Sequence, residues 1–472
     1  MKKIFLNYAV ALVSTMVVFT ACKEDEVIVP PPPVVPTSNE VILKTDISGT
    51  RNLVKDSVYV IEGQINVSGV LNIAAGTVIK GDKVTKGTLV VVQGGKLNAM
   101  GTATAPIVFT SRQAPGLRNS GDWGGIVLVG KATCNQTAPK VEGLSRDVSY
   151  GGGTDDADNS GTLQYVRIEF AGIALQPDKE INGLTMCAVG SGTTIDHIQV
   201  SYSGDDSFEW FGGKVDAKYI VAYLGLDDDF DTDYGYRGKV QYGLAVRNPR
   251  IADVSGSNGF ESDNDGSGST ATPKTAAIFS NITMIGAYQK TSSSNVQGSY
   301  GAGAHIRRNS SLSIFNSVFA GWNTAGILID GTTTYANATA GDLVIKNTVV
   351  SGTKVAADAI KGSGVTTADA AAWFSTSGKG NSIVKTNDTP KIAINKTDSA
   401  SITASFFNPT ATTAQAFTFI PAGNSPLLNA ADFTDSKLAS GFDKTSVTNI
   451  GAFGSTDWTT GWTNFDPQNT VY

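Results

Sequence analysis

Acidic side chains that could hold a cation or do acid–base chemistry are concentrated between residues 203 and 266. Three segments, SGDDSFEWFGG (203–213), LGLDDDFDTDYG (224–235) and SGSNGFESDNDG (255–266), share a phenylalanine followed by an acid. A shift of 22 residues superimposes the first segment on the second. The repeat singles out ten candidate metal ligands, namely Asp205, Asp206, Glu209, Asp227, Asp228, Asp229, Asp231, Glu261, Asp263 and Asp265.

The chemistry that this stretch suggests is calcium binding. Residues 203–266 contain 13 acids and 6 Lys or Arg residues. If the repeats stack as parallel strands, equivalent carboxylates lie about 4.7–4.9 Å apart and repel by about 3–4 kcal/mol at an effective dielectric near 20. Calcium, which takes about six to eight oxygen ligands, would neutralise them.

Two other interpretations of the acids stay open. They can be solvated turn residues, as most charged side chains are, because their spacing is not that of an EF-hand loop. They can also be catalytic, since a glycoside hydrolase uses two carboxylates about 5 or 6.5–9.5 Å apart. A polysaccharide lyase would need a basic residue as well, and the nearest in sequence are Arg237, Lys239 and Arg247.

The elements that must position these acids are short β-strands that recur with a regular period. Apolar runs such as IDHIQVSYSG, DAKYIVAYLG and KVQYGLAVRN end in Gly or Asn, which tolerate positive φ at a corner. The closest of these ends lie 21 and 23 residues apart. This pattern predicts an all-β fold, a parallel β-helix in which each coil takes about 21–23 residues plus variable loops.

The period also predicts two ladders of stacked side chains. Phe208, Phe230 and Phe260 would form an aromatic ladder inside the coil. Asn281, Asn316 and Asn347 each precede the closing glycine of a run by five residues and would form an asparagine ladder of purely structural role. Trp123, between glycines, is expected to pack in the core.

The C-terminal part is less regular. VTTADAAAWFS (365–375) is expected to form a short helix with Thr366 as its cap, covering an open coil edge. Residues from about 380 to 472 are expected to form a cap. Its aromatic residues Trp458, Trp462 and Phe465 are expected to pack rather than to bind sugar.

Composition narrows the classes of partner and chemistry. A net charge of −6 with no basic stripe argues against a nucleic-acid partner. The only two histidines, His197 and His305, argue against histidine-rich metal chemistry and are expected to be structural or exposed. Cys134 and Cys187 either pair in an oxidising compartment or remain separate thiols.

The N-terminus has the features of a bacterial lipoprotein. Residues 1–21 indicate a signal peptide, and FTAC (19–22) resembles a lipobox with Phe in place of the usual Leu, so Cys22 is the expected lipidation site. The next four residues resemble the acidic export signal of Bacteroidota surface lipoproteins, and Val27–Asn39 forms a Pro-rich stalk to the β-helix of residues 40–472. The signal residues are Lys23, Glu24, Asp25 and Glu26.

Long motifs extend this likeness over most of the chain. GDWGGIVLVGKA, YVRIEFAGIAL, TTIDHIQVSYSGDDSFEWFGG, GLDDDFDTDYGY and DWTTGWTNFDPQN together resemble a family of surface lipoproteins of Bacteroidota. The resemblance implies a right-handed parallel β-helix, lipid-anchored in the outer membrane and facing the exterior, and implies no catalytic residues.

Three functions fit this expectation. The chain is foremost expected to be a binding or structural surface module, with a polysaccharide or an outer-membrane protein as partner. The alternatives are a polysaccharide lyase or hydrolase on the same fold, and an accessory subunit of an outer-membrane uptake or secretion complex. Fold-level analogy alone does not separate them.

Overall fold

The computed structural model describes residues 40–176, 179–248, 251–286, 297–353, 355–384, 419–421, 423 and 425–472. All of them belong to one compact unit, Thr37–Tyr472. The signal peptide, Cys22, the acidic signal and the stalk lie outside the described residues, as does the stretch 385–418 of the expected cap. Among the helices that are described, none is long and apolar enough to cross a membrane.

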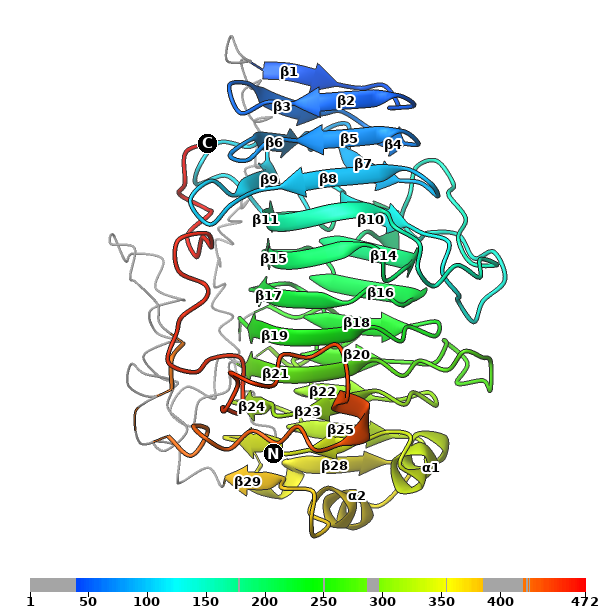
Figure 1. The fold of residues 1–472 in the computed structure, drawn as a ribbon, viewed down its shortest axis with the longest axis vertical. Helices are drawn as coiled ribbons and strands as arrows, with labels where there is room; N and C mark the ends of the chain where they lie inside the picture. Colours follow the sequence, from blue (N-terminus) through cyan, green and yellow to red (C-terminus); the bar gives the residue numbers. More distant parts are fainter. Residues whose placement is uncertain are drawn as a thin grey trace, which may run out of the picture. The chain divides into compact units, whose positions relative to one another are not determined.

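Parallel strands stack into a β-helix, as the sequence predicts (Figure 1). Two large sheets run along the stack, and every pairing within them is parallel; they are called sheet A and sheet B below. Sheet A contains β1 (Glu40–Leu43), β2 (Thr50–Leu53), β3 (Val58–Ile61), β5 (Val70–Ile73), β6 (Val78–Gly81), β8 (Lys96–Met100), β9 (Ile107–Ser111), β11 (Gly161–Glu169), β15 (Thr194–Ser201), β17 (Ala217–Tyr223), β19 (Lys239–Val246), β21 (Ile278–Ile285), β23 (Ser313–Phe315), β24 (Val318–Ala320), β26 (Ile345–Lys346), β27 (Val349–Ser351) and β29 (Ser382–Val384).

Sheet B has ten strands and carries the acidic repeats. Its strands are β4 (Gln64–Val67), β7 (Thr88–Val91), β10 (Gly125–Val129), β14 (Leu184–Val189), β16 (Phe208–Gly213), β18 (Phe230–Asp233), β20 (Phe260–Ser262), β22 (Ala304–Ile306), β25 (Ile327–Asp330) and β28 (Ile360–Ser363). A separate antiparallel pair joins β12 (Ala174–Gln176) and β13 (Lys179–Glu180).

The strand register confirms the predicted repeat. Phe208 pairs with Phe230, 22 residues later, and Phe230 pairs with Phe260. Their rings, buried inside the coil, lie 5.8 and 5.3 Å apart between centroids, so the predicted aromatic ladder forms. Because side chains alternate along a strand, the acid after each phenylalanine faces away from this core.

In sheet A the coil bends at a corner residue, which from β11 onwards has a left-handed backbone conformation. In the early coils this corner separates β8 from β9, whereas β11 and the next strands continue through it. Asn281, Asn316 and Asn347 occupy it with φ values of 57°, 49° and 51°, which asparagine tolerates better than most residues. The predicted asparagine ladder forms in part: Asn347 Nδ2 donates to Asn316 Oδ1 at 2.7 Å, but Asn281 Oδ1 accepts from Gln241 Nε2 at 3.0 Å.

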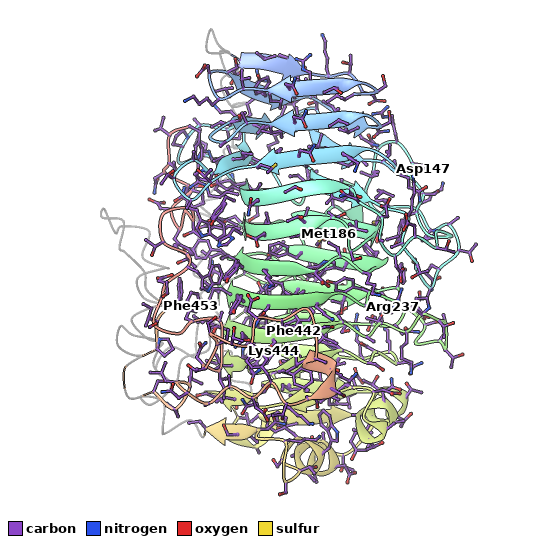
Figure 2. All side chains as sticks on the ribbon, in the orientation of Figure 1. Asp147, Met186, Arg237, Phe442, Lys444 and Phe453 are labelled. Carbon is purple, nitrogen blue, oxygen red and sulfur yellow. The ribbon has the colours of Figure 1, made fainter. Side chains whose placement is uncertain are left out.

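The C-terminal aromatic residues pack, as expected, and they do so along the flank of sheet A. The rings of Trp458 and Trp462 meet the His197 ring edge-on at 6.5 and 5.4 Å between centroids. Trp462 is buried. Phe453 marks this flank in Figure 2, on the side of the stack away from Arg237.

Two short helices lie near one end of the stack (Figure 1). The predicted helix is α2 (Thr367–Phe374), which packs on β28, the terminal strand of sheet B, and is capped by Thr366 Oγ1 accepting from Asp369 N at 3.1 Å. The other, α1 (Thr332–Ala340), escapes prediction because its TTTYANATA sequence favours helix poorly. Tertiary contacts hold it: buried Asn337 Nδ2 donates to Asn309 O at 2.9 Å.

Cys134 and Cys187 are separate thiols, so of the two interpretations the disulfide is wrong. Burial raises the pKa of Cys134 to about 11 and the pKa of Cys187 well above its usual value. Both side chains belong to an apolar cluster beside sheet B that includes Tyr150 and Phe211. They are therefore packing residues, since reactivity requires the thiolate.

Candidate functional site

A row of acids follows the outer face of sheet B. Glu209, Asp231 and Glu261 occupy equivalent positions on β16, β18 and β20, and His305 on β22 continues the row. Each lies one residue beyond an aromatic or apolar side chain that faces the core, such as Phe208 or Ala304. The repeated Phe–acid step of the sequence therefore produces this row.

A second row lies in the turns that lead into these strands. Asp206 Oδ1 accepts the backbone N–H of Asp228 at 2.8 Å, and Asp228 Oδ1 accepts the N–H of Asn258. Asn258 Oδ1 then accepts the N–H of Ala302 at 3.0 Å. Each side chain thus caps the next turn, which fixes the direction of the carboxylates.

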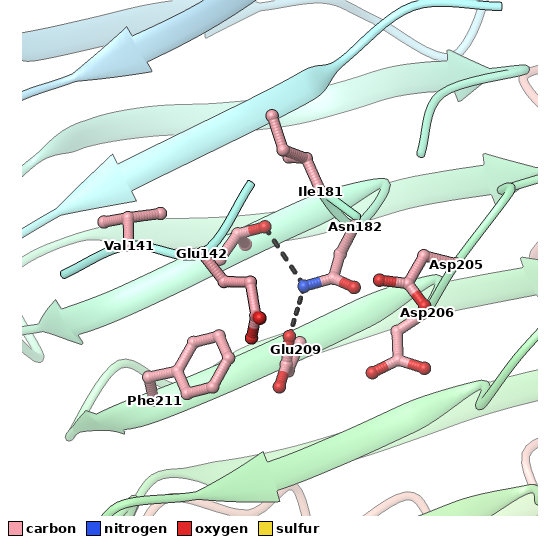
Figure 3. Close-up of a pocket in the computed structure, with 9 residues that line it drawn as sticks. Val141, Glu142, Ile181, Asn182, Asp205, Asp206, Glu209 and Phe211 are labelled. Carbon is pink, nitrogen blue, oxygen red and sulfur yellow. Dashed lines mark hydrogen bonds between the residues drawn. The ribbon is translucent and has the colours of Figure 1, made fainter. Parts of the chain in front are cut away.

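The two rows meet in a pocket of about 220 Å³ (Figure 3). Asp205, Asp206 and Glu209 line it from sheet B, and Asn182 lines it from the preceding coil. Glu142 reaches it from the long loop that follows β10. With Phe211 and two aliphatic side chains at its margin, the pocket, called the acid pocket below, has mainly oxygen atoms to offer a ligand.

Asn182 has an amide oxygen without a protein partner. The residue is only 4% exposed, and its Nδ2 donates to Glu209 Oε2 and, at 3.3 Å, to Thr185 Oγ1. Its Oδ1 is buried and accepts no hydrogen bond from the part of the chain that the structure describes. Figure 3 shows this oxygen directed towards Asp205. A buried acceptor without a partner is costly, and a bound cation or a water molecule would satisfy it.

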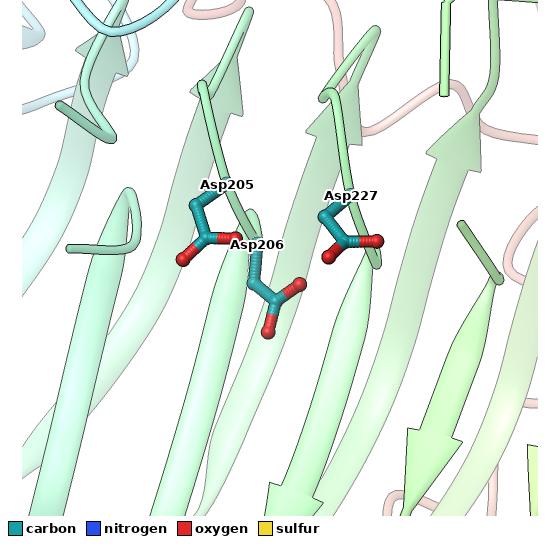
Figure 4. A group of neighbouring side chains, drawn as sticks. All are labelled: Asp205, Asp206 and Asp227. Carbon is teal, nitrogen blue, oxygen red and sulfur yellow. The ribbon is translucent and has the colours of Figure 1, made fainter. Parts of the chain in front are cut away.

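Two groups of three carboxylates have oxygens within 4.8 Å of one another. Asp206, Glu209 and Asp231 form the first, and Asp205, Asp206 and Asp227 form the second (Figure 4). Asp206 belongs to both, so the groups make one continuous cluster. Carboxylate and amide oxygens at this spacing suit a hard divalent cation such as Ca²⁺, and the cluster has no nitrogen or sulfur ligand that would favour a softer metal.

Proton affinity in the cluster is unusually high. Burial, followed by the neighbouring charge of Asp205, raises the pKa values of Asp206 and Glu209 well above their usual range. Burial and then Glu209 do the same for Asp231. Burial and then Asp228 raise the pKa of Asp227 to about 8. A bound cation would compete with these protons, because it stabilises the ionised carboxylates.

Four of the ten predicted ligands already have partners within the protein: three form ion pairs with arginines, and the fourth, Asp265, accepts hydrogen bonds from serines. Asp229 forms a fully buried ion pair with Arg247 at 3.2 Å. Asp263 pairs with Arg307 at 3.0 Å and Arg308 at 2.8 Å, and Glu261 pairs with Arg307. Asp265 accepts bonds from Ser267 and Ser269, which lower its pKa to about 2 against the effect of burial.

The structure leaves six of the predicted ligands for a cation. The solvated-turn interpretation is wrong for five of the ten: Asp206, Asp228, Asp229, Asp263 and Asp265 are buried. The remaining candidates are Asp205, Asp206, Glu209, Asp227, Asp228 and Asp231.

The three basic residues considered for a lyase do not line the acid pocket. Arg247 is buried against Asp229, Arg237 bonds to Asp156 at 3.2 Å, and Lys239 Nζ donates to Ser440 O at 2.8 Å. Arg307 and His305 lie on the acid face instead. Sequence reasoning missed them because 44 residues separate Glu261 from its register partner His305.

His305 lies between two carboxylates at the end of the acid row. Its Nε2 is 3.0 Å from Asp330 Oδ2, and its Nδ1 is 4.0 Å from Glu261 Oε2. Burial nevertheless lowers its pKa. These contacts are compatible with the expected structural role of His305, and the apolar–polar alternation of AHIR (304–307) was the signal that places its side chain on the outer face.

A comparison with protein families agrees with this architecture. Residues 45–463 match the model of a family described as a pectate-lyase like beta helix domain. The chain belongs to this family. No curated protein and no solved structure matches it. Membership in the pectate-lyase-like family accounts for nearly all of the described coil, but a fold shared by many proteins does not define the chemistry of its sites.

Proposed function

We propose that this pectate-lyase-like β-helix is a surface lipoprotein that holds Ca²⁺ in the acid pocket and binds acidic polysaccharide through it. The observation that carries the proposal is the meeting of Asp206, Glu209 and Asp231 within 4.8 Å beside the buried amide oxygen of Asn182. Four oxygen donors from successive coils converge there, and none of them has a basic side chain as ion-pair partner among the described salt bridges.

Calcium fits these donors better than magnesium. The ligands come from separate coils, and their positions are fixed by the strand register rather than by one short loop. Calcium accepts irregular arrangements of about six to eight oxygens, whereas Mg²⁺ demands a compact octahedron at about 2.0–2.1 Å. Asp227 and Asp228 lie close enough to this cluster to influence its charge.

Acidic polysaccharide is the ligand class that such a site favours. A cation held by protein on one side keeps positions for oxygens from outside, and the carboxylates of uronic acids are oxygens of this kind. The acid row extends over three successive strands, from Glu209 to Glu261, which gives a polymer an extended surface to lie on. At its far end, Arg307 and Arg308 pair with Glu261 and Asp263, which reduces the negative charge that a polymer would meet there.

The N-terminal motifs support the location of this module. Cys22 in its lipobox context, the acidic export signal Lys23–Glu26 and the Pro-rich stalk are together typical of a protein anchored in the outer membrane and displayed outwards. On a stalk, the β-helix would meet polysaccharides outside the cell.

An enzyme is the second candidate, and Glu142 is the observation that favours it. Glu142 and Glu209 lie side by side in the acid pocket, one from a loop and one from sheet B (Figure 3). Two carboxyl groups in different environments are the equipment of a glycoside hydrolase. Release of reducing sugar from polygalacturonate or a neutral glycan, lost in Glu209→Gln, would turn the proposal towards hydrolysis.

The proposal is tested first by thermal unfolding of the detergent-solubilised full chain in Ca²⁺ and in EGTA. A ligand that binds only the folded state stabilises it by about 2.7 kcal/mol at 100 times its Kd, so Ca²⁺ should raise the Tm. The double variant Asp206→Asn/Asp231→Asn should lose the rise, and Asp443→Asn, which pairs with Lys218 away from the pocket, should keep it.

Two results would count against the proposal. A wild-type Tm that is the same in EGTA and in millimolar Ca²⁺ would remove the cation site. A Ca²⁺-dependent Tm without Ca²⁺-dependent retention on immobilised polygalacturonate would leave the cation site and remove the polysaccharide.

A further inference from the structure

A second hollow lies on the same side of the coil as the acid pocket. Its volume is about 490 Å³, and its lining includes Asn135, Gln136, Tyr234, Asp265 and Ser269. Asn135 and Gln136 belong to the long loop after β10, and Tyr234 directly follows β18. Residues 265–271 form the turn after β20. This hollow, called the tyrosine pocket below, plays no part in the proposed cation site.

The walls of the tyrosine pocket are tied together by hydrogen bonds. Asn135 N donates to Tyr234 O at 2.9 Å, and Asn135 Nδ2 donates to the carbonyl of the buried Asn264 at 2.8 Å. Asn264 Nδ2 in turn donates to Ser269 O at 3.0 Å. Three segments that are far apart in sequence therefore hold one shape, which is the property of a preformed binding site.

The chemistry of the tyrosine pocket is that of a neutral ligand. Apart from Ala271 it presents one aromatic ring, two amides and several hydroxyls. Its single carboxylate, Asp265, is saturated by Ser267 and Ser269, which also hold its pKa near 2. Burial raises the pKa of Tyr234 to about 12, so the phenol remains neutral. A ring beside amides and hydroxyls matches the C–H face and hydroxyls of a sugar.

The tyrosine pocket adjoins the acid pocket. Phe211 lines the acid pocket, and the centroid of its ring is 5.5 Å from that of Tyr234, which lines the tyrosine pocket. Phe211 lies in β16 opposite Asp233, and Tyr234 directly follows the neighbouring strand β18, at a strand spacing of about 4.8 Å. One extended ligand can therefore contact both pockets.

We propose that the tyrosine pocket binds a neutral sugar ring adjacent to a uronate that is held through Ca²⁺ in the acid pocket. This inference rests on the proposed function and specifies its ligand: an acidic polysaccharide in which neutral residues alternate with uronic acids. Tyr234 stacks on the neutral ring, and the Gln136 amide, which Asn135 Oδ1 holds in place at 3.1 Å, binds its hydroxyls. A polymer of uronic acids alone would use the acid pocket and leave the Tyr234 ring uncovered.

The test compares two probes on the detergent-solubilised full chain with saturating Ca²⁺. Hyaluronan oligosaccharides alternate glucuronate with a neutral amino sugar, and oligogalacturonates contain uronate alone. Tyr234→Asn removes the ring but suits the left-handed backbone of this position, where φ is 51°. It should weaken hyaluronan binding about tenfold, the equivalent of about 1.4 kcal/mol, and leave oligogalacturonate binding and the Ca²⁺-dependent Tm unchanged.

Three controls keep the inference open to refutation. Tyr234→Phe should retain hyaluronan affinity, since it keeps the ring, and Tyr335→Ala on α1 should have no effect on either probe. Should Tyr234→Asn fail to fold by its melting curve, Gln136→Ala should weaken hyaluronan binding selectively.

The inference is overturned by equal affinities of wild type and Tyr234→Asn for hyaluronan, or by binding of oligogalacturonate alone. It is also overturned if neither probe binds although Ca²⁺ raises the Tm. Loss of the Ca²⁺ effect itself would instead remove the cation site on which both proposals depend, so the two failures are distinguishable.

Discussion

At the scale of single residues, the ten predicted acidic ligands differ in whether an arginine forms a salt bridge with them. Arg247 reaches Asp229, and Arg307 reaches Glu261 and Asp263, so these charges are cancelled within the protein. No Lys or Arg of the described chain forms a salt bridge with Asp206 or Asp231. Buried like charges without such a partner raise one another's pKa values, which makes this part of the fold sensitive to pH.

Stability in the absence of calcium should fall as the pH rises from about 4 to 8. In this window the folded state binds a proton that the unfolded state has released, because the pKa of Asp227 is about 8 in the fold, against about 3.9 in an unfolded chain. A state that binds more protons loses stability as pH rises. Carboxyls with lowered pKa values, such as Asp265 at about 2, finish titrating below the window.

Melting temperatures in EGTA at pH 5, 6, 7 and 8 would measure this dependence. Addition of Ca²⁺ should restore stability most at pH 8, where fewest protons compete, and least at pH 5. Asp206→Asn/Asp231→Asn should flatten the EGTA profile. A Tm in EGTA that increases steadily from pH 5 to pH 8 would contradict the assignment of these carboxyls as protonated in the calcium-free fold.

At the scale of elements, the corner of sheet A forms a column of rings. Tyr165, His197, Tyr219 and Tyr242 occupy equivalent positions, all with positive φ, and their centroids are 4.3, 4.4 and 4.6 Å apart. A left-handed residue turns its side chain away from both flanking strands, so the rings stack on the outside of the coil. Trp462 then covers the column edge-on.

Removal of the Trp462 side chain, which covers this column of rings, should destabilise the folded state. Trp462→Ala is expected to lower the free energy of unfolding by about 3–5 kcal/mol, because it opens a cavity and exposes the rings of Tyr165 and His197. Urea denaturation followed by fluorescence measures this loss. The reference variant is Tyr335→Ala, which truncates a partly exposed side chain. A loss below about 1 kcal/mol, typical of a surface position, would show that the tail is not part of the folded core.

The sequence predicts the parts of this fold that repeat. It does not predict contacts between residues that only the strand register brings together. Phe208, Phe230 and Phe260 share a nearly constant spacing, so their ladder follows from period alone. The column of rings was not predicted, because the sequence alone does not show that its tyrosines and His197 occupy equivalent positions. Only the strand register shows this. Asn182 was missed because only the folded coil places its amide oxygen beside Asp205.

At the scale of the whole described unit, the C-terminal segment and the two pockets lie on different sheets. The C-terminal segment covers sheet A, whereas the acid pocket and the tyrosine pocket lie along sheet B. Phe453 and Arg237 mark the separate sides in Figure 2. The described part of the tail therefore packs away from the proposed polysaccharide face.

Replacement of the proposed lipidation site should release the protein. Cys22→Ser removes the thiol that would carry the diacylglycerol, and without several acyl chains no stable anchor remains. The variant is expected to leave the membrane fraction, while Cys134→Ser, a half-buried thiol of the β-helix, should stay with it. Protease shaving of intact cells should degrade wild type. Retention of Cys22→Ser in membranes, or protection of wild type from protease, would contradict the proposed location.

The C-terminal segment has a consequence for the order in which the chain folds. Its hydrogen bonds reach partners on many different coils: Pro467 O accepts from Arg118, 349 residues away, Asn464 bonds to Gln199 across 265 residues, and Asn449 O accepts from Asn281 across 168. Contacts of such long range form slowly, because the intervening chain must be ordered first. The segment can dock only on coils that are already stacked, so its docking is the closing step of folding and its release the opening step of unfolding.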